Sequence, residues 1–163
     1  MNELVIGHAL RDSVREVLEK MFFVQALEGS SAAELSASVP GAEIAVRLAF
    51  EGRPPGSLTL RVNTVAAREI AAGFLGQDEE SVSDRQMADV VCELANMICG
   101  SLLSRVEGAT AFQLEAPRIV PLPEDPGAGP AAISYATNLS RGALAVTVTI
   151  GMSPCPDLLP FAS

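Results

Sequence analysis

Residues 84–106 read DRQMADVVCELANMICGSLLSRV and predict a long helix that is apolar except along one line. At about 100° per residue, four polar or small residues fall within one narrow sector of this helix, here named the polar row: Asp89, Glu93, Asn96 and Gly100. The rest of the surface is largely hydrophobic, with Val90, Val91, Leu94, Met97, Ile98 and Leu102. Such a helix must be buried on most sides, so the remaining elements have to pack around it.

Two members of the polar row are poor choices for a helix interior. Glycine costs a helix about 1 kcal/mol relative to alanine, a cost that makes sense if something approaches closely at Gly100, beside Asn96. Asparagine is also a weak helix former. The plainer alternative is that Glu93 and Asn96 belong to the solvated face of an amphipathic helix. The apolar surroundings favour a docking surface with chemistry on it.

The composition indicates one domain. The chain has 163 residues, of which 48% are hydrophobic, enough to bury a substantial core. We expect a single domain over residues 1–163, with its core at about 3–150 and a proline-bearing tail at 152–163 that is loosely attached. Met21, Phe22, Phe23 and Met97 are expected to fill the core or an interface.

Charge and patterning exclude several classes of function. The formal net charge is -9 and the eleven basic residues form no run, which disfavours nucleic acid binding. The N-terminus carries charges too early for a secretory signal. Residues 131–151 are interrupted by Asn138, Ser140 and Arg141, so they are too polar to span a bilayer. We therefore expect a cytoplasmic protein without membrane insertion.

No constellation for a metal or a nucleophile is apparent. Cys92, Cys99 and Cys155 lack a CxxC spacing, and His8 is the single histidine, so we expect no metal site and cysteines that act as small hydrophobes. A glycine-rich phosphate cradle and a G-x-S-x-G motif are also missing. The chemistry, if any, must come from the polar row.

Periodicity predicts the other elements. In the first half we expect a helix at 3–23, a strand near 35–39, a hairpin of 43–51 with 58–62, and a short helix capped by Asn63 or Thr64 and closed by Gly76. In the second half Ser83 and Gln86 fit a capping box that starts the long helix, which ends near Val106. A strand at 112–116 up to Pro117, a proline-rich loop at 121–130 and a hairpin of 133–139 with 143–150 follow.

This order predicts an α+β domain in which two long helices and one short helix pack on a mixed, mainly antiparallel sheet. A weak internal duplication is also indicated, because the first helix carries Asp12, Glu16 and Glu19 at the spacing of Asp89, Glu93 and Asn96. In the first helix Phe23 stands where the second has Gly100. We interpret the three acidic residues of the first helix as solvated charges.

The segment DVVCELANMICG resembles the active-site helix of the CheC, CheX and FliY chemotaxis phosphatases, and most closely CheX. Pro117, the preceding hairpin and the short helix ending FLG fit this pattern as well, and the similarity extends over about residues 3–150. CheC-type members carry a second E-x-x-N site on the first helix. Glu19 replaces that asparagine here, as expected of a CheX-like domain with one site.

The resemblance implies hydrolysis of the aspartyl phosphate of a CheY-like response regulator in chemotaxis or a related two-component pathway. Asn96 would orient the attacking water, and Glu93 would pair with a lysine of the regulator. Asp89 and Gly100 would contact the partner, Asp89 at the rim and Gly100 by leaving room, whereas Pro117 is structural. The protein needs no cofactor of its own, because the regulator would supply Mg²⁺.

Two other functions remain open on the sequence. The same helix could bind a receiver domain or a flagellar switch component as a non-catalytic adaptor. Alternatively, the polar row could be a homodimer contact, although the resemblance favours dimers formed along sheet edges.

Overall fold

The computed structural model describes residues 3–26, 42–52, 55–107, 112–122 and 132–150. The helices are α1 (Glu3–Met21), α3 (Thr64–Leu75) and α4 (Asp84–Glu107), with a short 3-10 helix η1 (Glu79–Ser81). The strands are β1 (Glu43–Glu51), β2 (Gly56–Asn63), β3 (Gln113–Leu114), β4 (Arg118–Val120), β5 (Ala132–Leu139) and β6 (Gly142–Ile150). The predicted strand at 35–39, most of the proline-rich loop and the tail at 152–163 lie outside the described residues.

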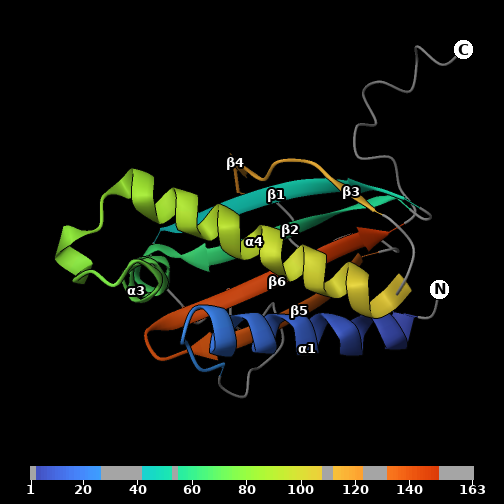
Figure 1. Ribbon diagram of the computed structural model, residues 1–163, viewed down its shortest axis with the longest axis horizontal. Helices are drawn as coiled ribbons and strands as arrows, with labels where there is room; N and C mark the ends of the chain where they lie inside the picture. The colour runs from blue at the N-terminus through green and yellow to red at the C-terminus, as the bar shows by residue number, and fades with distance from the viewer. Residues whose placement is uncertain (1–2, 27–41, 53–54, 108–111, 123–131, 151–163) are drawn as a thin grey trace, which may run out of the picture.

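One sheet runs in the order β3-β1-β2-β6-β5, with β4 also paired to β1. The two long helices α1 and α4 lie side by side on one face of this sheet, and the short helix α3 lies at one end of the layer (Figure 1). The predicted α+β single domain is thereby confirmed. All strand pairings among the described residues are antiparallel, so this part of the sheet is not mixed.

The core lies between the sheet and the helices. Alternation in the strands turns one set of side chains toward the helical layer, and burial of each is worth about 1.5–3 kcal/mol. The largest fully buried side chains are Phe22, Phe50, Leu10, Leu18, Leu48, Leu58, Leu60, Ile70, Leu94, Ile98, Leu102 and Leu144. All three helices contribute to this set, as the predicted periodicity requires.

The start of α4 is fixed by the predicted capping box. The backbone N–H of Gln86 donates to Ser83 Oγ at 3.1 Å, and the backbone N–H of Ser83 donates to Gln86 Oε1 at 2.9 Å. Among the described helices, α4 alone is long and apolar enough to cross a membrane. It is instead a core helix, since it contacts α1, α3 and the sheet along its length.

The topology agrees with the predicted duplication. The units α1–β1–β2 and α4–β5–β6 meet where β2 pairs antiparallel with β6. The helix of each unit contacts the outer strand of the other unit, because α1 packs on β5 and α4 packs on β1. An approximate two-fold axis therefore passes between β2 and β6, and it makes α1 antiparallel to α4 (Figure 1).

One of the two predicted caps of α3 was incomplete. Asn63 occupies the N-cap position of α3, but its side chain makes no capping hydrogen bond. Its Oδ1 accepts from the Ala143 N–H at 3.1 Å instead, tying β2 to β6. Gly76 does close α3 in the left-handed conformation, with φ of 67°.

The strand predicted at 112–116 is shorter than expected, and β4 was not predicted. Leu114 pairs with Phe50, and Arg118 pairs with Arg47. The edge segment therefore advances four residues, from Leu114 to Arg118, while β1 advances only three, from Arg47 to Phe50. One extra residue is therefore accommodated between β3 and β4, as in a β-bulge. Pro117 lies in this interruption, where its missing N–H breaks no pairing, which supports the structural role predicted for it.

Candidate functional site

The polar row lies along the outward line of α4. Asp89 and Glu93 are exposed, whereas Asn96 and Gly100 are half-buried. The neighbouring side chains on α4 point into the core and are buried: Val90, Val91, Leu94, Ala95, Ile98, Cys99 and Leu102. The structure thus brings the four predicted residues together on one accessible surface, with Asn96 one turn beyond Glu93.

Glu93 and Asn96 are not engaged within the domain. With the residues that the structure describes, neither side chain forms a hydrogen bond or an ion pair. A carboxylate and an amide in this position remain available to an external partner, because no donor or acceptor among the described residues satisfies them.

Packing among the described residues does not require glycine at position 100. A Cβ atom built on Gly100 meets no atom within 4 Å. Gly142 is a contrasting case, since a Cβ atom there would collide with the side chain of Asn63. The helix interior therefore carries the propensity cost of Gly100 without an internal steric reason.

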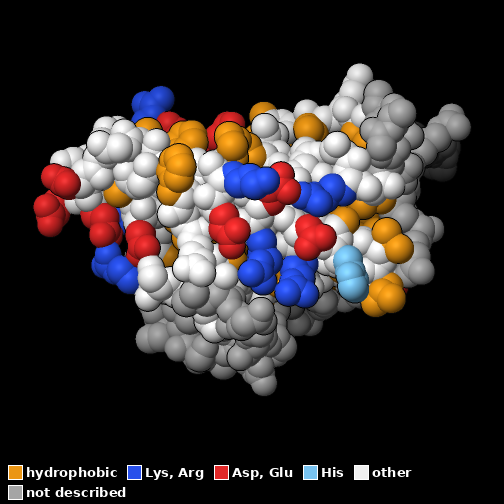
Figure 2. All heavy atoms as spheres, turned by 60° about the horizontal axis from the view of Figure 1, so that its bottom comes forward, with side chains coloured by type: hydrophobic (Ala, Val, Ile, Leu, Met, Phe, Trp, Pro, Cys, Tyr) orange, Lys and Arg blue, Asp and Glu red, His pale blue; other side chains and the backbone are white. Residues whose placement is uncertain are grey.

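The corresponding row on α1 is engaged differently. Asp12, Glu16 and Glu19 are exposed, as predicted, and the helix presents acidic and basic side chains in alternation (Figure 2). Glu16 is not simply solvated, however, and this corrects the sequence interpretation. It forms an ion pair with Arg105 of α4, and its Oε1 lies 3.9 Å from Nζ of Lys20. The ion-pair partner Arg105 is distant in sequence, so the periodicity of the first helix could not predict the pair.

The described cysteines are packing residues. Burial raises the pKa of the Cys99 thiol to about 12. Burial, with a smaller contribution from the charge of Asp89, also raises the pKa of Cys92. Both thiols are therefore protonated near neutral pH and poor nucleophiles. Within the described ranges, no group of three His, Cys, Asp or Glu side chains is arranged to hold a metal ion.

The family model for the chemotaxis phosphatase CheX matches residues 44–122, a segment that includes the whole polar row. Solved structures with the same fold include CheX, CheC-like and FliY proteins and the middle domain of FliM. The CheX family model covers just under half of the chain, and the solved structures show the same fold, so the chain is similar to the CheC/CheX/FliY proteins. Among curated protein sequences, none matches it.

Three solved structures illustrate the likeness to the CheC/CheX/FliY family. CheX from Vibrio vulnificus is 16% identical with a TM-score of 0.70, and the match covers 92% of this chain and 99% of that one. A chain of the CheX–CheY–BeF3–Mg²⁺ complex from Borrelia burgdorferi is 19% identical with a TM-score of 0.70, covering 89% and 97%. FliY from Thermotoga maritima is 16% identical with a TM-score of 0.57, covering 96% and 89%.

The structure decides between the two roles predicted for Phe23. It was expected to fill the core or an interface, and its side chain is 79% exposed while Phe22 is fully buried, so the core alternative is wrong for Phe23. A run of two phenylalanines at a helix end does not reveal which one turns inward. The backbone conformation after the helix decides it.

Proposed function

We propose that this protein is a phosphatase for the aspartyl phosphate of a CheY-like receiver domain, acting in the cytoplasm in chemotaxis or a related two-component pathway. The match of residues 44–122 to the CheX family model supports this proposal. The availability of Glu93 and Asn96 on one outward line of α4, flanked by buried side chains, is the observation that carries it.

In this proposal Asn96 is the catalytic residue. Its amide both donates and accepts hydrogen bonds without changing protonation, so it can hold a water in line with the phosphorus of the receiver's phosphoryl group. Orienting the water lowers the barrier entropically and requires no covalent intermediate. The receiver supplies the Mg²⁺ that neutralises the phosphoryl oxygens.

Glu93 sets the position of Asn96. As an exposed carboxylate one turn away, it pairs with a lysine of the receiver and fixes the depth and angle at which α4 enters. Asp89 contacts the partner at the rim. Gly100 lets the partner's backbone approach the helix, because no side chain stands there.

The decay of a phosphorylated receiver tests the proposal. The wild-type protein is expected to accelerate decay, and Asn96→Ala is expected to abolish the acceleration while it still binds the BeF3-activated receiver. Asn138→Ala, on β5, is a matched control that removes an amide outside the polar row. No acceleration with any receiver from the same genome would contradict the proposal.

The same assay separates the adaptor alternative. An adaptor would bind phosphorylated and unphosphorylated receivers equally and leave decay unchanged. If the polar row were instead a homodimer contact, Asn96→Arg would shift sedimentation toward a smaller species.

A further inference from the structure

Phe23 adopts a backbone conformation that is unfavourable for a bulky side chain. Its φ is 58°, and among the described residues no other non-glycine has a positive φ. The N–H of Val24 donates to the carbonyl of Leu18 at 2.9 Å, which closes the end of α1 in a turn one residue wider than the Schellman turn after α3. After α3 the left-handed residue is Gly76, which adopts this conformation without steric cost.

The fold gains little from the Phe23 side chain in return. Phe23 is 79% exposed. The neighbouring Phe22 anchors the end of α1 instead, because it is fully buried and its ring lies 4.7 Å from that of Phe74. A strained and exposed aromatic residue is therefore better explained by a contact outside the domain.

The position of Phe23 links it to the polar row. Ser101 Oγ donates to Ser13 Oγ at 3.2 Å, which places these residues opposite each other on antiparallel helices. Met21, the last residue of α1, lies eight residues beyond Ser13, about 12 Å along that direction, and Phe23 follows two residues later. This end of α1 is level with the turn of α4 that runs from Asp89 to Glu93.

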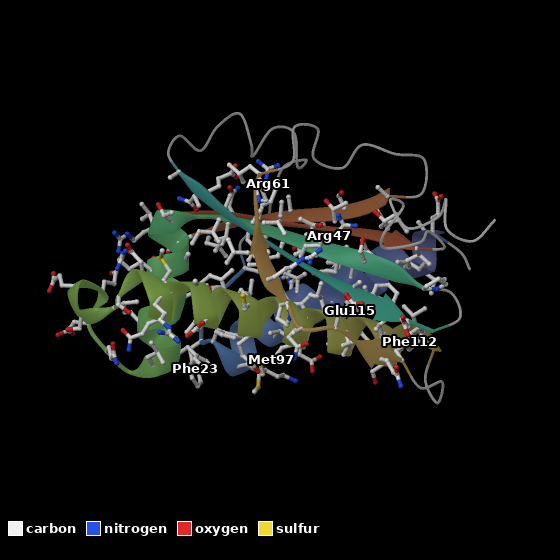
Figure 3. The ribbon with its side chains drawn as sticks, turned by 90° about the horizontal axis from the view of Figure 1, so that it is seen from above. Phe23, Arg47, Arg61, Met97, Phe112 and Glu115 are labelled. Atoms are coloured by element: carbon white, nitrogen blue, oxygen red, sulfur yellow. The ribbon has the colours of Figure 1, made fainter. Side chains whose placement is uncertain are left out.

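Met97 is a second partly exposed hydrophobic residue beside the polar row. It directly follows Asn96 and is half-buried. Figure 3 shows Phe23 and Met97 on the side of the helical layer that faces away from the sheet. Aromatic residues and methionine are enriched at the centres of protein interfaces, and a phenylalanine loses little rotamer entropy on binding.

We propose that Phe23, assisted by Met97, is a docking contact for the receiver domain that engages the polar row. This inference rests on the proposed function. Phe23 provides affinity and plays no part in placing the water, because Asn96 does that from α4. Phe23 lies just after α1 and outside the segment matched by the CheX family model.

The test replaces Phe23 by glycine. Phe23→Gly is expected to raise the dissociation constant for the BeF3-activated receiver with Mg²⁺ at least tenfold. The decay rate of the phosphorylated receiver at saturating protein should not change. The unfolding midpoint should rise by about 2–4 °C, because glycine accepts the left-handed conformation. Val5→Ala, an exposed hydrophobic residue at the other end of α1, is expected to leave binding unchanged.

Each outcome has a distinct meaning. If the wild type and Phe23→Gly bind equally, the docking contact is wrong and the phosphatase proposal stands. If Phe23→Gly unfolds at a lower temperature, the side chain serves the fold and the inference fails. If the wild type neither binds a receiver nor accelerates its decay, both proposals fail.

Discussion

Arg105, near the end of α4, forms an ion pair with Glu16 of α1, which corresponds to Glu93 in the internal repeat. The same guanidinium donates from Nε to Ser101 Oγ at 3.4 Å. One carboxylate of the repeated pair is therefore committed to joining the two helices, whereas Glu93 forms no such pair with any described residue. The two halves share a spacing but use it for different purposes.

The Glu16–Arg105 pair should make only a small contribution to stability. The side chain of Glu16 is 45% exposed and that of Arg105 is 33% exposed, so solvent screens the attraction between them. A double-mutant cycle of Glu16→Ala and Arg105→Ala is expected to give a coupling of about 0.2–1 kcal/mol in urea unfolding. Receiver dephosphorylation should be unaffected, and its loss in Glu16→Ala would show that the first helix takes part in the reaction.

Gly100 offers a test in which stability and function move in opposite directions. Gly100→Ala should stabilise the domain by about 1 kcal/mol, because the methyl group meets open space and alanine favours the helix. Binding of the activated receiver should weaken, and Gly100→Leu should weaken it further. Thermal unfolding and receiver titration provide the measurements. Tight binding by Gly100→Leu would argue against a close approach there.

Gly142→Ala is the control for that substitution. A Cβ atom at this position would collide with Asn63, whose side chain joins β2 to β6. The variant should lower the unfolding midpoint, in contrast to Gly100→Ala. Equal stabilisation by both would mean that the local packing at Gly142 relaxes freely.

Glu93→Gln is expected to weaken receiver binding without changing the free energy of unfolding. The side chain is exposed and makes no ion pair with the described residues, so the fold loses nothing. Removing the charge should also reduce the salt dependence of binding, because exposed charge pairs are screened. Binding measured at several ionic strengths checks this, and an unchanged affinity would remove Glu93 from the contact.

The alkaline stability of the domain should depend on Cys99. Burial raises its pKa from 9.0 to about 12, so above pH 9 the unfolded state loses this proton while the folded state keeps it. The stability provided by the neutral buried thiol is then fully present below pH 9 and declines as the pH rises toward 12. Cys99→Ala should show a shallower decline in chemical unfolding between these values. An identical pH profile would contradict the assignment.

Strong local signals made most of this fold predictable. Three of these signals each favour a single local structure, and the structure adopts it in every case. They are the capping box at Ser83 and Gln86, the glycine that ends α3 and the alternation in β1. The polar row was visible because it interrupts an apolar helix. What the sequence concealed depends on contacts between distant segments: the use of Asn63 by β6, the division of the edge strand around Pro117, and the capture of Glu16 by Arg105.

The orientation of Phe23 belongs to the same group. Its exposure follows from a backbone torsion, and the letters FF at a helix end are compatible with either residue facing the core. Pattern analysis assigns faces by spacing, and spacing loses its meaning where the helix ends.

The approximate two-fold relation between the halves has a further consequence. A partner that recognised only the backbone of the two antiparallel helices could settle on them in two orientations, half a turn apart, with nothing to choose between them. Only the side chains distinguish the two orientations. Asn96 and Gly100 lie at one end of the helix pair, and Glu19 and Phe23 take the corresponding positions at the other end. A partner can therefore bind productively in one orientation only, so each chain has one productive binding site.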